Sequence, residues 1–247
     1  MSDSPLPEIL PHGADGILLR LGLSARESTV AAVQILRAAM EDACPHGVEE
    51  IASSLTSVYL RFDPARTTRA EVCATAQSIA RGVDLSATTL PAPRRRWTIP
   101  VVLGGEHGPQ FDEMVRATGH SDQRAREVLL SARLRVLAIG FAPGLPYMGL
   151  LPEAWDVPRL RDVTPKVPAC ALVAAVRQLI IFTNPTPTGW RHIGQTAFHG
   201  FQVGRDPATA LSAGDEIRLE QMTPADLHGL QTDNPDGLGG ARCEVLS

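Results

Sequence analysis

The chain has 247 residues, enough for one large domain or two smaller ones. Its hydrophobic share of 44% and charged share of 20% are those of an ordinary globular protein. The net charge of −4 argues against a nucleic-acid-binding surface, because phosphate binding requires clustered Lys and Arg. No apolar run is long enough to cross a bilayer, so we expect neither nucleic acid nor a membrane as a partner.

Two further features predict a cytoplasmic protein. The N-terminus is polar and lacks the basic and apolar regions of a signal peptide. The widely spaced cysteines, Cys44, Cys73, Cys170 and Cys243, form no C-x-x-C pair. They therefore fit free thiols in a reducing compartment better than a disulfide framework or a zinc site, and we expect no metal site.

Residues 1–90 predict a small α/β domain. A short strand at 17–21 is followed by apolar residues at helical spacing from Val30 to Met40, and then by two strand-like runs within 48–62. A second amphipathic helix follows Thr68, with Glu71 placed to complete a capping box. Strand, helix, two strands and helix is the order of a split βαβ, ferredoxin-like layer.

A second domain is predicted over residues 97–222, after a linker at 86–96 that contains the basic cluster Arg94-Arg95-Arg96. Short strand-like runs alternate with turn residues there, which favours a closed or nearly closed β-barrel and an α+β fold class overall. The expected strands lie at 97–103, 134–141, 170–176, 179–183, 191–196, 200–203 and 216–219, with helices at 110–118 and 121–130.

Composition changes again near the C-terminus. We expect residues 223–247 to form a flexible tail, because 231–242 is rich in Gly, Asn and Asp. The last residues, 243–246, regain strand character. They could pair with an exposed sheet edge, or they could be frayed.

The most informative segment is 139–149, where an apolar strand runs into two prolines and three glycines. Proline fixes φ and removes a donor, whereas glycine allows positive φ, so the backbone here is shaped in advance. Phe141 and Tyr147 flank the loop, which could form the wall of a small-molecule pocket. The alternative is a tight turn with two core aromatic residues.

A second glycine-rich loop, residues 104–109, lies between a predicted strand and a predicted helix. Glu106 offers an acid and His107 a possible base, and backbone amides near the helix start could hold an anion. The alternative is a connecting turn whose Glu and His are solvated. No Gly-Lys-Ser/Thr follows, so the loop is not a Walker motif.

For several residues later in the chain, the sequence allows more than one structural or functional role. Lys166 could place a positive charge at the barrel mouth, or it could be ordinary surface charge. Trp190 could floor a pocket or plug one end of the barrel. Arg191 and His192 alternate on one strand, so at most one of them can face a pocket inside the barrel. Cys170 begins an apolar run and is interpreted as a core residue rather than a nucleophile.

Taken together, these segments resemble one family: the B subunit of the bacterial ATP-dependent 5-oxoprolinase, also called allophanate hydrolase subunit 1 or the KipI family. The Pro-Gly-x-Pro-Tyr-x-Gly run is the most specific match, and order and spacing agree from about residue 10 to 220. The matching segments are 99–102, 104–109, 140–149, 164–165, 167–169 and 189–196.

The resemblance implies an N-terminal α/β domain joined to a cyclophilin-like β-barrel, and an enzyme component whose activity belongs to a complex. The implied partners are the C subunit, a second cyclophilin-like protein, and a third, LamB/YcsF-type A subunit. The implied reaction is hydrolysis of a cyclic amide after phosphorylation of its oxygen, with ATP and Mg²⁺ as cofactors. Phosphorylation converts a poor electrophile into one that water can attack.

On this hypothesis, Glu106 and His107 make acid–base or polar contacts, and Lys166 holds phosphate or carboxylate. The expected substrate-binding residues are Phe141, Pro143, Gly144, Tyr147, Gln178 and Trp190. Two alternatives remain: a regulator of the KipI type that inhibits a histidine kinase, and a carboxyltransferase-like accessory of urea or allophanate metabolism.

The chain departs from the family pattern after 167–169. Relatives usually carry Gly-Ser and further glycines there, whereas this chain has the apolar run 170–176. Gln178 is kept, Phe182 replaces a Tyr, and Gln195 replaces the arginine usual after the Ile-Gly pair. These changes predict a drier pocket, and hence a different substrate or the absence of catalysis.

Overall fold

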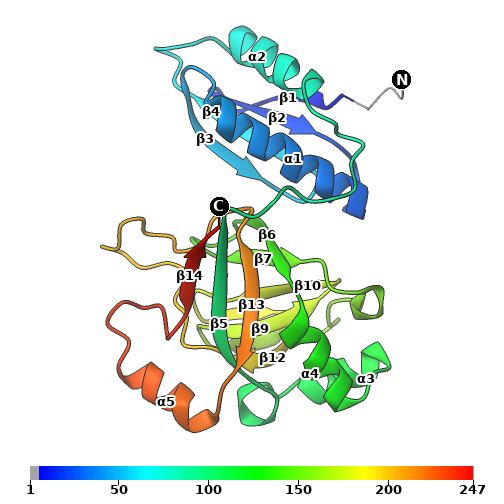
Figure 1. Cartoon of the computed structure of the whole chain (residues 1–247), viewed down its shortest axis with the longest axis vertical. Coiled ribbons are helices and arrows are strands. Elements are labelled where there is room, and N and C mark those ends of the chain that lie inside the picture. Colours follow the sequence, from blue (N-terminus) through cyan, green and yellow to red (C-terminus); the bar gives the residue numbers. More distant parts are fainter. Residues whose placement is uncertain (1–5, 247) are drawn as a thin grey trace. The chain divides into compact units, whose positions relative to one another are not determined.

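The computed structural model describes residues 6–246. The chain divides into two compact units, one ending at Ala92 and the other beginning at Pro93 (Figure 1). The polar N-terminus noted above, residues 1–5, lies outside the described residues. Among the helices of residues 6–246, none is long and apolar enough to cross a membrane.

The first unit is an antiparallel sheet with two helices. Its elements are β1 (Glu8–His12), β2 (Gly16–Arg20), α1 (Glu27–Ala43), β3 (Val48–Ser53), β4 (Ser57–Phe62) and α2 (Arg69–Arg81). The strand order is β1-β2-β4-β3, so α1 connects two strands that are not neighbours. A ferredoxin-like sheet takes its fourth strand after the second helix, whereas here the remaining strand, β1, precedes β2. The ferredoxin-like assignment therefore stays a prediction.

Strand alternation gives this sheet one apolar face. Ile17 and Leu19 of β2 and Val58 and Leu60 of β4 are all buried and belong to one cluster with side chains of α1 and α2. Both helices thus lie on the same face of the sheet.

The predicted cap of α2 is confirmed. The Thr68 hydroxyl accepts a hydrogen bond from the Glu71 amide, and the Glu71 carboxylate accepts one from the Thr68 amide. Two amides at the start of the helix are thereby satisfied within four residues of sequence.

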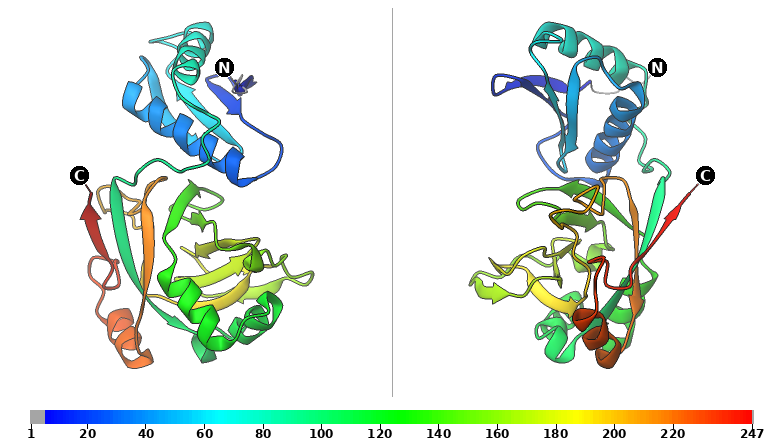
Figure 2. Two further views of the ribbon diagram at one scale, coloured as in Figure 1. Left: turned by 45° about the vertical axis from the view of Figure 1, so that its right-hand side comes forward. Right: turned by 90° about the vertical axis from the view of Figure 1, so that its left-hand side faces the viewer.

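The second unit is a barrel with helices at its margins (Figure 2). Its strands are β5 (Arg95–Leu103), β6 (Leu134–Ile139), β7 (Pro146–Gly149), β8 (Thr164–Val167), β9 (Ala171–Ala175), β10 (Gln178–Ile181), β11 (Thr186–Thr188), β12 (Arg191–Gln195), β13 (Glu216–Gln221) and β14 (Arg242–Val245). Its helices are α3 (Phe111–Thr118), α4 (Asp122–Ser131) and α5 (Pro224–Thr232), with short 3₁₀ turns η1 (Gly105–His107) and η2 (Glu153–Trp155).

A ring of hydrogen-bonded strands closes the barrel. The order β12-β9-β10-β7-β6-β13-β5 returns to β12 through the pairs Gly194–Leu103 and Gln195–Val102. Neighbours are antiparallel except for β13 and β5, which run parallel. This closed seven-strand ring is consistent with the predicted cyclophilin-like barrel.

Apolar side chains fill the inside of the ring. Leu172 and Ala174 of β9, Leu179 of β10 and Ile193 of β12 are fully buried in this cluster, together with residues of α3 and α4. The barrel interior is therefore packed like an ordinary core.

The outer face of β9 and β10 carries a separate apolar cluster. Val173 and Ile180, which are register partners on adjacent strands, belong to it together with Phe182 and Trp190. The two-stranded ribbon β8–β11 adds Val167 to the same cluster. The pocket described below lies on this outer face.

Four strands were not predicted: β1, β7, β8 and β11. Each contains a proline, which reads in the sequence as a turn or a strand break. Conversely, the strand predicted at 200–203 is only an isolated bridge between Phe201 and Thr209.

The expected linker and tail also need correction. β5 begins at Arg95, inside the expected linker, and two arginines of the basic cluster form ion pairs: Arg95 with Asp215 at 2.6 Å and Arg96 with Glu216 at 2.5 Å. The segment expected as a flexible tail contains α5 and β14. β14 pairs with β5 over residues 242–245, which agrees with the edge-pairing alternative.

Candidate ligand pocket on the outer face of the barrel

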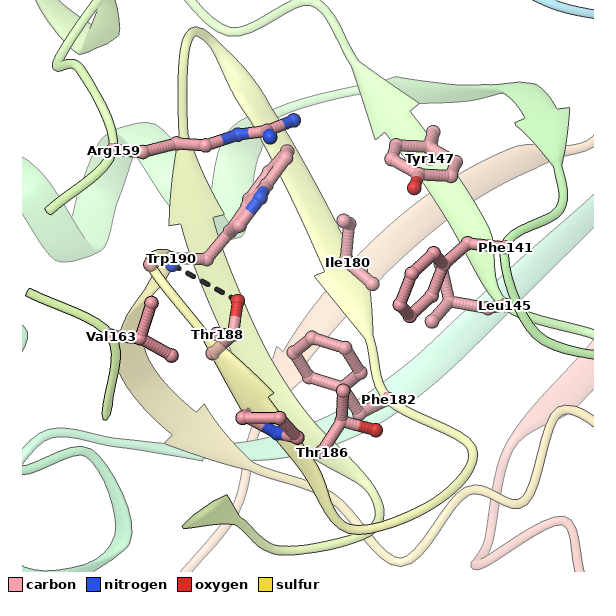
Figure 3. Close-up of a pocket in the computed structure, with 12 residues that line it drawn as sticks. Phe141, Leu145, Tyr147, Arg159, Val163, Ile180, Phe182, Thr186, Thr188 and Trp190 are labelled. Carbon is pink, nitrogen blue, oxygen red and sulfur yellow. Dashed lines mark hydrogen bonds between the residues drawn. The ribbon is translucent and has the colours of Figure 1, made fainter. Parts of the chain in front are cut away.

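A cavity of about 390 Å³ opens on the outer face of the barrel wall, between β7, β10 and the ribbon β8–β11 (Figure 3). Most of its lining is apolar or aromatic. The lining residues are Phe141, Leu145, Tyr147, Arg159, Val163, Ile180, Phe182, Thr186, Pro187, Thr188, Gly189 and Trp190. Its volume falls within the range of small-molecule sites.

Strand register explains how Tyr147 and Ile180 come to share this face. Tyr147 on β7 is the direct partner of Ile180 on β10, and directly opposed side chains point to the same side of a sheet. The next pair, Met148 and Leu179, points into the barrel core. The same wall thus packs the interior on one side and offers the pocket on the other.

Trp190 forms one side of the cavity. Its backbone amide donates to the Thr188 hydroxyl at 3.1 Å, and its ring meets Tyr147 edge to face at a centroid distance of 6.2 Å (Figure 3). The Arg159 guanidinium lies over the Trp190 ring, 5.2 Å from its centroid. Of the two roles considered for Trp190, a pocket residue or a plug at one end of the barrel, the structure favours the pocket residue, because Trp190 lies outside the barrel interior.

Gly189 brings the segment that carries Arg159 close to the ribbon. The Leu160 amide donates to the Gly189 carbonyl at 2.7 Å, and a Cβ at Gly189 would lie 3.0 Å from the Leu160 carbonyl oxygen. A larger residue would push the two segments apart. The position of Arg159 over Trp190 therefore depends on a glycine thirty residues away in the sequence.

The loop 140–146 forms the lip of the pocket. Phe141 is 82% exposed and has a φ of +69°, a conformation that bulky residues rarely adopt. The loop is tight: the Gly140 amide donates to the Leu145 carbonyl, and the Leu145 amide to that of Ala142. Gly144 has a φ of +68°, and a Cβ there would lie 2.8 Å from Cβ of Phe201. Gly144 is thus required where the loop meets the 200–201 segment.

Three of the predicted substrate-binding residues, Phe141, Tyr147 and Trp190, line this one cavity. Pro143 and Gly144 belong to the lip but are not among the lining residues. Gln178 is buried on β10, two residues before Ile180, and is also outside the lining. The roles of these residues in substrate binding stay predictions.

The three predicted catalytic residues lie outside this lining. Glu106 and His107 sit in η1 after β5, where His107 Nε2 is 3.6 Å from a Glu106 carboxylate oxygen. Lys166 is exposed on β8. Their catalytic roles also stay predictions.

One glycine of the 104–109 loop, Gly108, has a packing reason. Gly108 lies so close to β12 that a Cβ there would be 2.2 Å from the Ile193 carbonyl oxygen. The Gly104 amide donates to that same carbonyl at 3.0 Å, and the Gln110 amide donates to the His192 carbonyl at 3.0 Å. These contacts hold the connection between β5 and α3 against the barrel wall.

His192 and Arg191 are both buried on β12. Arg191 donates to Glu113 of α3 at 2.9 Å and to the Pro158 carbonyl at 2.7 Å. His192 is 6% exposed, and its Nε2 has no hydrogen-bond partner among the described residues. Burial lowers the pKa of His192, and the nearby His107 lowers it further, against opposing hydrogen bonds that involve the two residues at 194 and 195.

Cys170 is a buried thiol rather than a nucleophile. Its Sγ lies 3.6 Å from Nδ1 and 3.7 Å from Nε2 of His199, but burial raises the pKa of the thiol to about 12. The sequence interpretation as a core residue agrees with this environment.

Arg159 and the threonine hydroxyls are the pocket features that sequence reasoning missed. Arg159 is not among the predicted site residues, and its contact with Trp190 places it at the pocket. It is the only cation among the lining residues, and no acidic residue is among them. Within the described part of the chain, Arg159 has no ion pair.

This lining does not fit Mg²⁺-bound ATP. Mg²⁺ prefers carboxylate and other oxygen ligands, and the pocket offers no carboxylate. Residues 6–246 also contain no group of three or more His, Cys, Asp or Glu side chains that could hold a metal ion. No step is therefore assigned to a nucleotide or a metal in this pocket.

Residues 7–211 match the family described as "Carboxyltransferase domain, subdomain C and D". A curated relative, the 5-oxoprolinase B subunit of Bacillus subtilis (strain 168), is 26% identical over 229 residues, which cover 90% of this chain and 95% of that protein.

Solved structures share the fold. TTHA0988 matches with a TM-score of 0.66 and 26% identity, over 84% of this chain and 40% of that chain. The K. lactis urea amidolyase matches with a TM-score of 0.71 and 15% identity, over 99% of this chain but only 16% of that much longer one. At that identity the likeness concerns the fold alone.

Proposed function

The chain belongs to the carboxyltransferase subdomain C and D family, which includes proteins named as the B subunit of 5-oxoprolinase, and we propose that it is the B-type component of an amidohydrolase complex of that kind. The observation that carries the proposal is the match to the Bacillus subtilis protein along 95% of its length. The match covers nearly the whole of both chains, so the simplest interpretation is that this chain is the same kind of enzyme component.

The pocket supports the proposal by bringing together Phe141, Tyr147 and Trp190, which belong to the segments shared with the family. In this role the chain binds and orients a substrate ring and excludes water from one side of it. Positioning of that kind contributes to rate by holding the reacting bond where other groups can reach it.

The proposed reaction is opening of a cyclic amide after ATP-dependent phosphorylation of the amide oxygen. Because the pocket itself offers no carboxylate for Mg²⁺-bound ATP, we expect partner subunits to hold the nucleotide and the metal, with the γ-phosphate within reach of the amide oxygen. The proposed partners are a second barrel protein that resembles the C subunit and a LamB/YcsF-type A subunit, in the cytoplasm.

The experiment is ADP release by this chain together with both partner proteins, with and without 5-oxoproline. The proposal expects release that depends on 5-oxoproline, or on another cyclic amide, and that requires all the components. Absence of amide-dependent ADP release from the assembled complex would contradict it.

A pull-down from cell extract tests the assignment independently. Recovery of a second barrel protein that resembles the C subunit supports the enzyme. Recovery of a sensor histidine kinase would instead indicate the KipI-type regulator, and recovery of a biotin-carrying protein would indicate the carboxyltransferase accessory.

A further inference from the structure

We infer that the outer-face pocket selects a flat, mainly apolar ring that carries one carboxylate, and that Arg159 binds this carboxylate. The inference deepens the proposed function and rests on it only in treating the pocket as the substrate site. It names a ligand class from the pocket's own walls, charge and size.

The walls favour a flat ring. Phe141, Tyr147, Phe182 and Trp190 surround the cavity, and Ile180 lies between them on the barrel wall (Figure 3). Aromatic side chains pack best against another planar ring, stacked or edge to face. A small, strongly polar ligand would leave its donors and acceptors unpaired against these walls, which is unfavourable.

The volume of the cavity also favours a large apolar ring as the ligand. A cavity of about 390 Å³ is larger than a single five-membered ring can fill. This volume lies within the range of sites that take drug-sized ligands, so the cavity has room for two fused rings. A larger apolar ring would displace more water from the aromatic walls and gain more from their burial.

The charge selects the substituent. Arg159 is the only charged residue of the lining, and the described residues give it no ion pair. The Arg159 guanidinium lies over the Trp190 ring, 5.2 Å from its centroid, and the N–H groups at the edge of the guanidinium plane can donate to a carboxylate as a pair. The same charge repels a cationic ligand, although an aromatic cavity by itself would attract one.

Two further polar groups limit the ligand to a single charged substituent. The Thr188 hydroxyl already accepts the Trp190 amide, so its own hydrogen is free to donate. Thr186 adds a second hydroxyl, which donates to the Asn184 carbonyl at 2.9 Å. These groups can satisfy one further oxygen but not several.

The test is direct binding to the purified full chain without partner proteins. The probe is 2-naphthoate, followed by isothermal titration, and it is compared with methyl 2-naphthoate, with a naphthyl trimethylammonium ion and with 5-oxoproline. We expect 2-naphthoate to bind roughly tenfold more tightly than its ester, because one charge-assisted pair is lost in the ester. The cation and 5-oxoproline should bind more weakly still.

Variants locate the binding. Arg159→Gln should abolish the preference for acid over ester while leaving ester binding unchanged. Arg161→Gln, an exposed arginine outside the lining, is the matched control and should retain the preference. Phe141→Ala should weaken acid and ester alike, because it removes one apolar wall.

Equal binding of acid and ester by the unmodified chain would overturn the inference. So would tighter binding of 5-oxoproline than of 2-naphthoate, or an acid preference that survives Arg159→Gln. These outcomes are separable from the proposed function: loss of ADP release in the complex would leave the binding result standing. Amide-dependent ADP release without any binding of 2-naphthoate would reject the inference alone.

Discussion

Two glycine-rich loops follow strands of the barrel, and they do opposite things. In the 104–109 loop, Gly108 presses against the Ile193 carbonyl and the loop is seated on β12. In the 140–146 loop, Gly144 presses against the 200–201 segment, and the turn holds Phe141 out at the lip of a cavity. Both patterns look equally suited to binding in the sequence.

The difference teaches that glycine marks close approach of the backbone to something, without saying to what. Where the neighbour is another strand of the same barrel, the glycine serves packing. Where the neighbour is a distant loop, the same feature can shape an opening.

The largest effect is expected from Gly108→Ala. Its Cβ would lie 2.2 Å from a carbonyl oxygen of β12, and backbone atoms cannot move aside as a flexible side chain can. We expect the free energy of unfolding to fall by about 3 kcal/mol or more. Urea unfolding measures this, with Gly105→Ala as the control.

Gly105 meets nothing within 4 Å but has a φ of +58°, so its substitution carries backbone strain only and should cost about 1 kcal/mol. Equal losses for the two variants would show that the contact with β12 is not what requires Gly108.

Gly144→Ala should have the next largest effect. The substitution combines a φ of +68° with a Cβ 2.8 Å from Phe201, and we expect a loss of about 2 kcal/mol together with displacement of the lip. Thermal unfolding checks the stability. Gly140→Ala, which meets nothing within 4 Å and has an ordinary φ, should change it by less than about 0.5 kcal/mol.

Buried His192 on β12, the strand against which the 104–109 loop packs, should also make the free energy of unfolding depend on pH. Burial lowers the pKa of His192 in the folded state, with His107 of η1 adding to the effect. As pH falls through the unfolded value of about 6.5, the unfolded chain takes up a proton that the folded chain does not, and stability decreases. Between about pH 7.5 and 5.5, the melting temperature should fall more steeply for the unmodified protein than for His192→Gln. Equal dependence of the melting temperature on pH in the two proteins would show that His192 does not cause the effect.

Phe141→Ala should have the smallest effect on stability. The side chain is 82% exposed, so the free energy of unfolding should change by less than about 0.5 kcal/mol. Amide-dependent ADP release by the complex should nevertheless fall, because the lip loses its aromatic wall. Unchanged release with unchanged stability would show that the lip plays no part in the reaction.

The strands that the sequence predictions missed all contain proline, although β5, with Pro100, was predicted. α1 and α2 have clear apolar spacing, and the capping box at Thr68 was placed correctly. β1, β7, β8 and β11 were missed because Pro11, Pro146, Pro165 and Pro187 lie in them. Those prolines occupy the outer strand β1, the first residue of β7 and the two-stranded ribbon, where a missing amide donor is tolerated.

The candidate site divides in a similar way. For Phe141, Tyr147 and Trp190 the local patterns allow either a pocket or a core position, the family resemblance favours the pocket, and all three line the cavity. Arg159 was not chosen, because its place over Trp190 depends on the backbone contact between Leu160 and the ribbon glycine at 189. Contacts of this kind join segments whose separation along the chain carries no pattern.

The sequence by itself determined the local features: the amphipathic helices, the short apolar runs that form strands of the barrel and the shared segments that mark the family. These depend on neighbours along the chain, where spacing fixes which side chains share a face. Only the tertiary structure decided that the barrel interior is solid and that the cavity lies on its outer wall. Both faces of β9 and β10 are apolar, and alternation alone cannot tell which of two apolar faces is covered and which is left open.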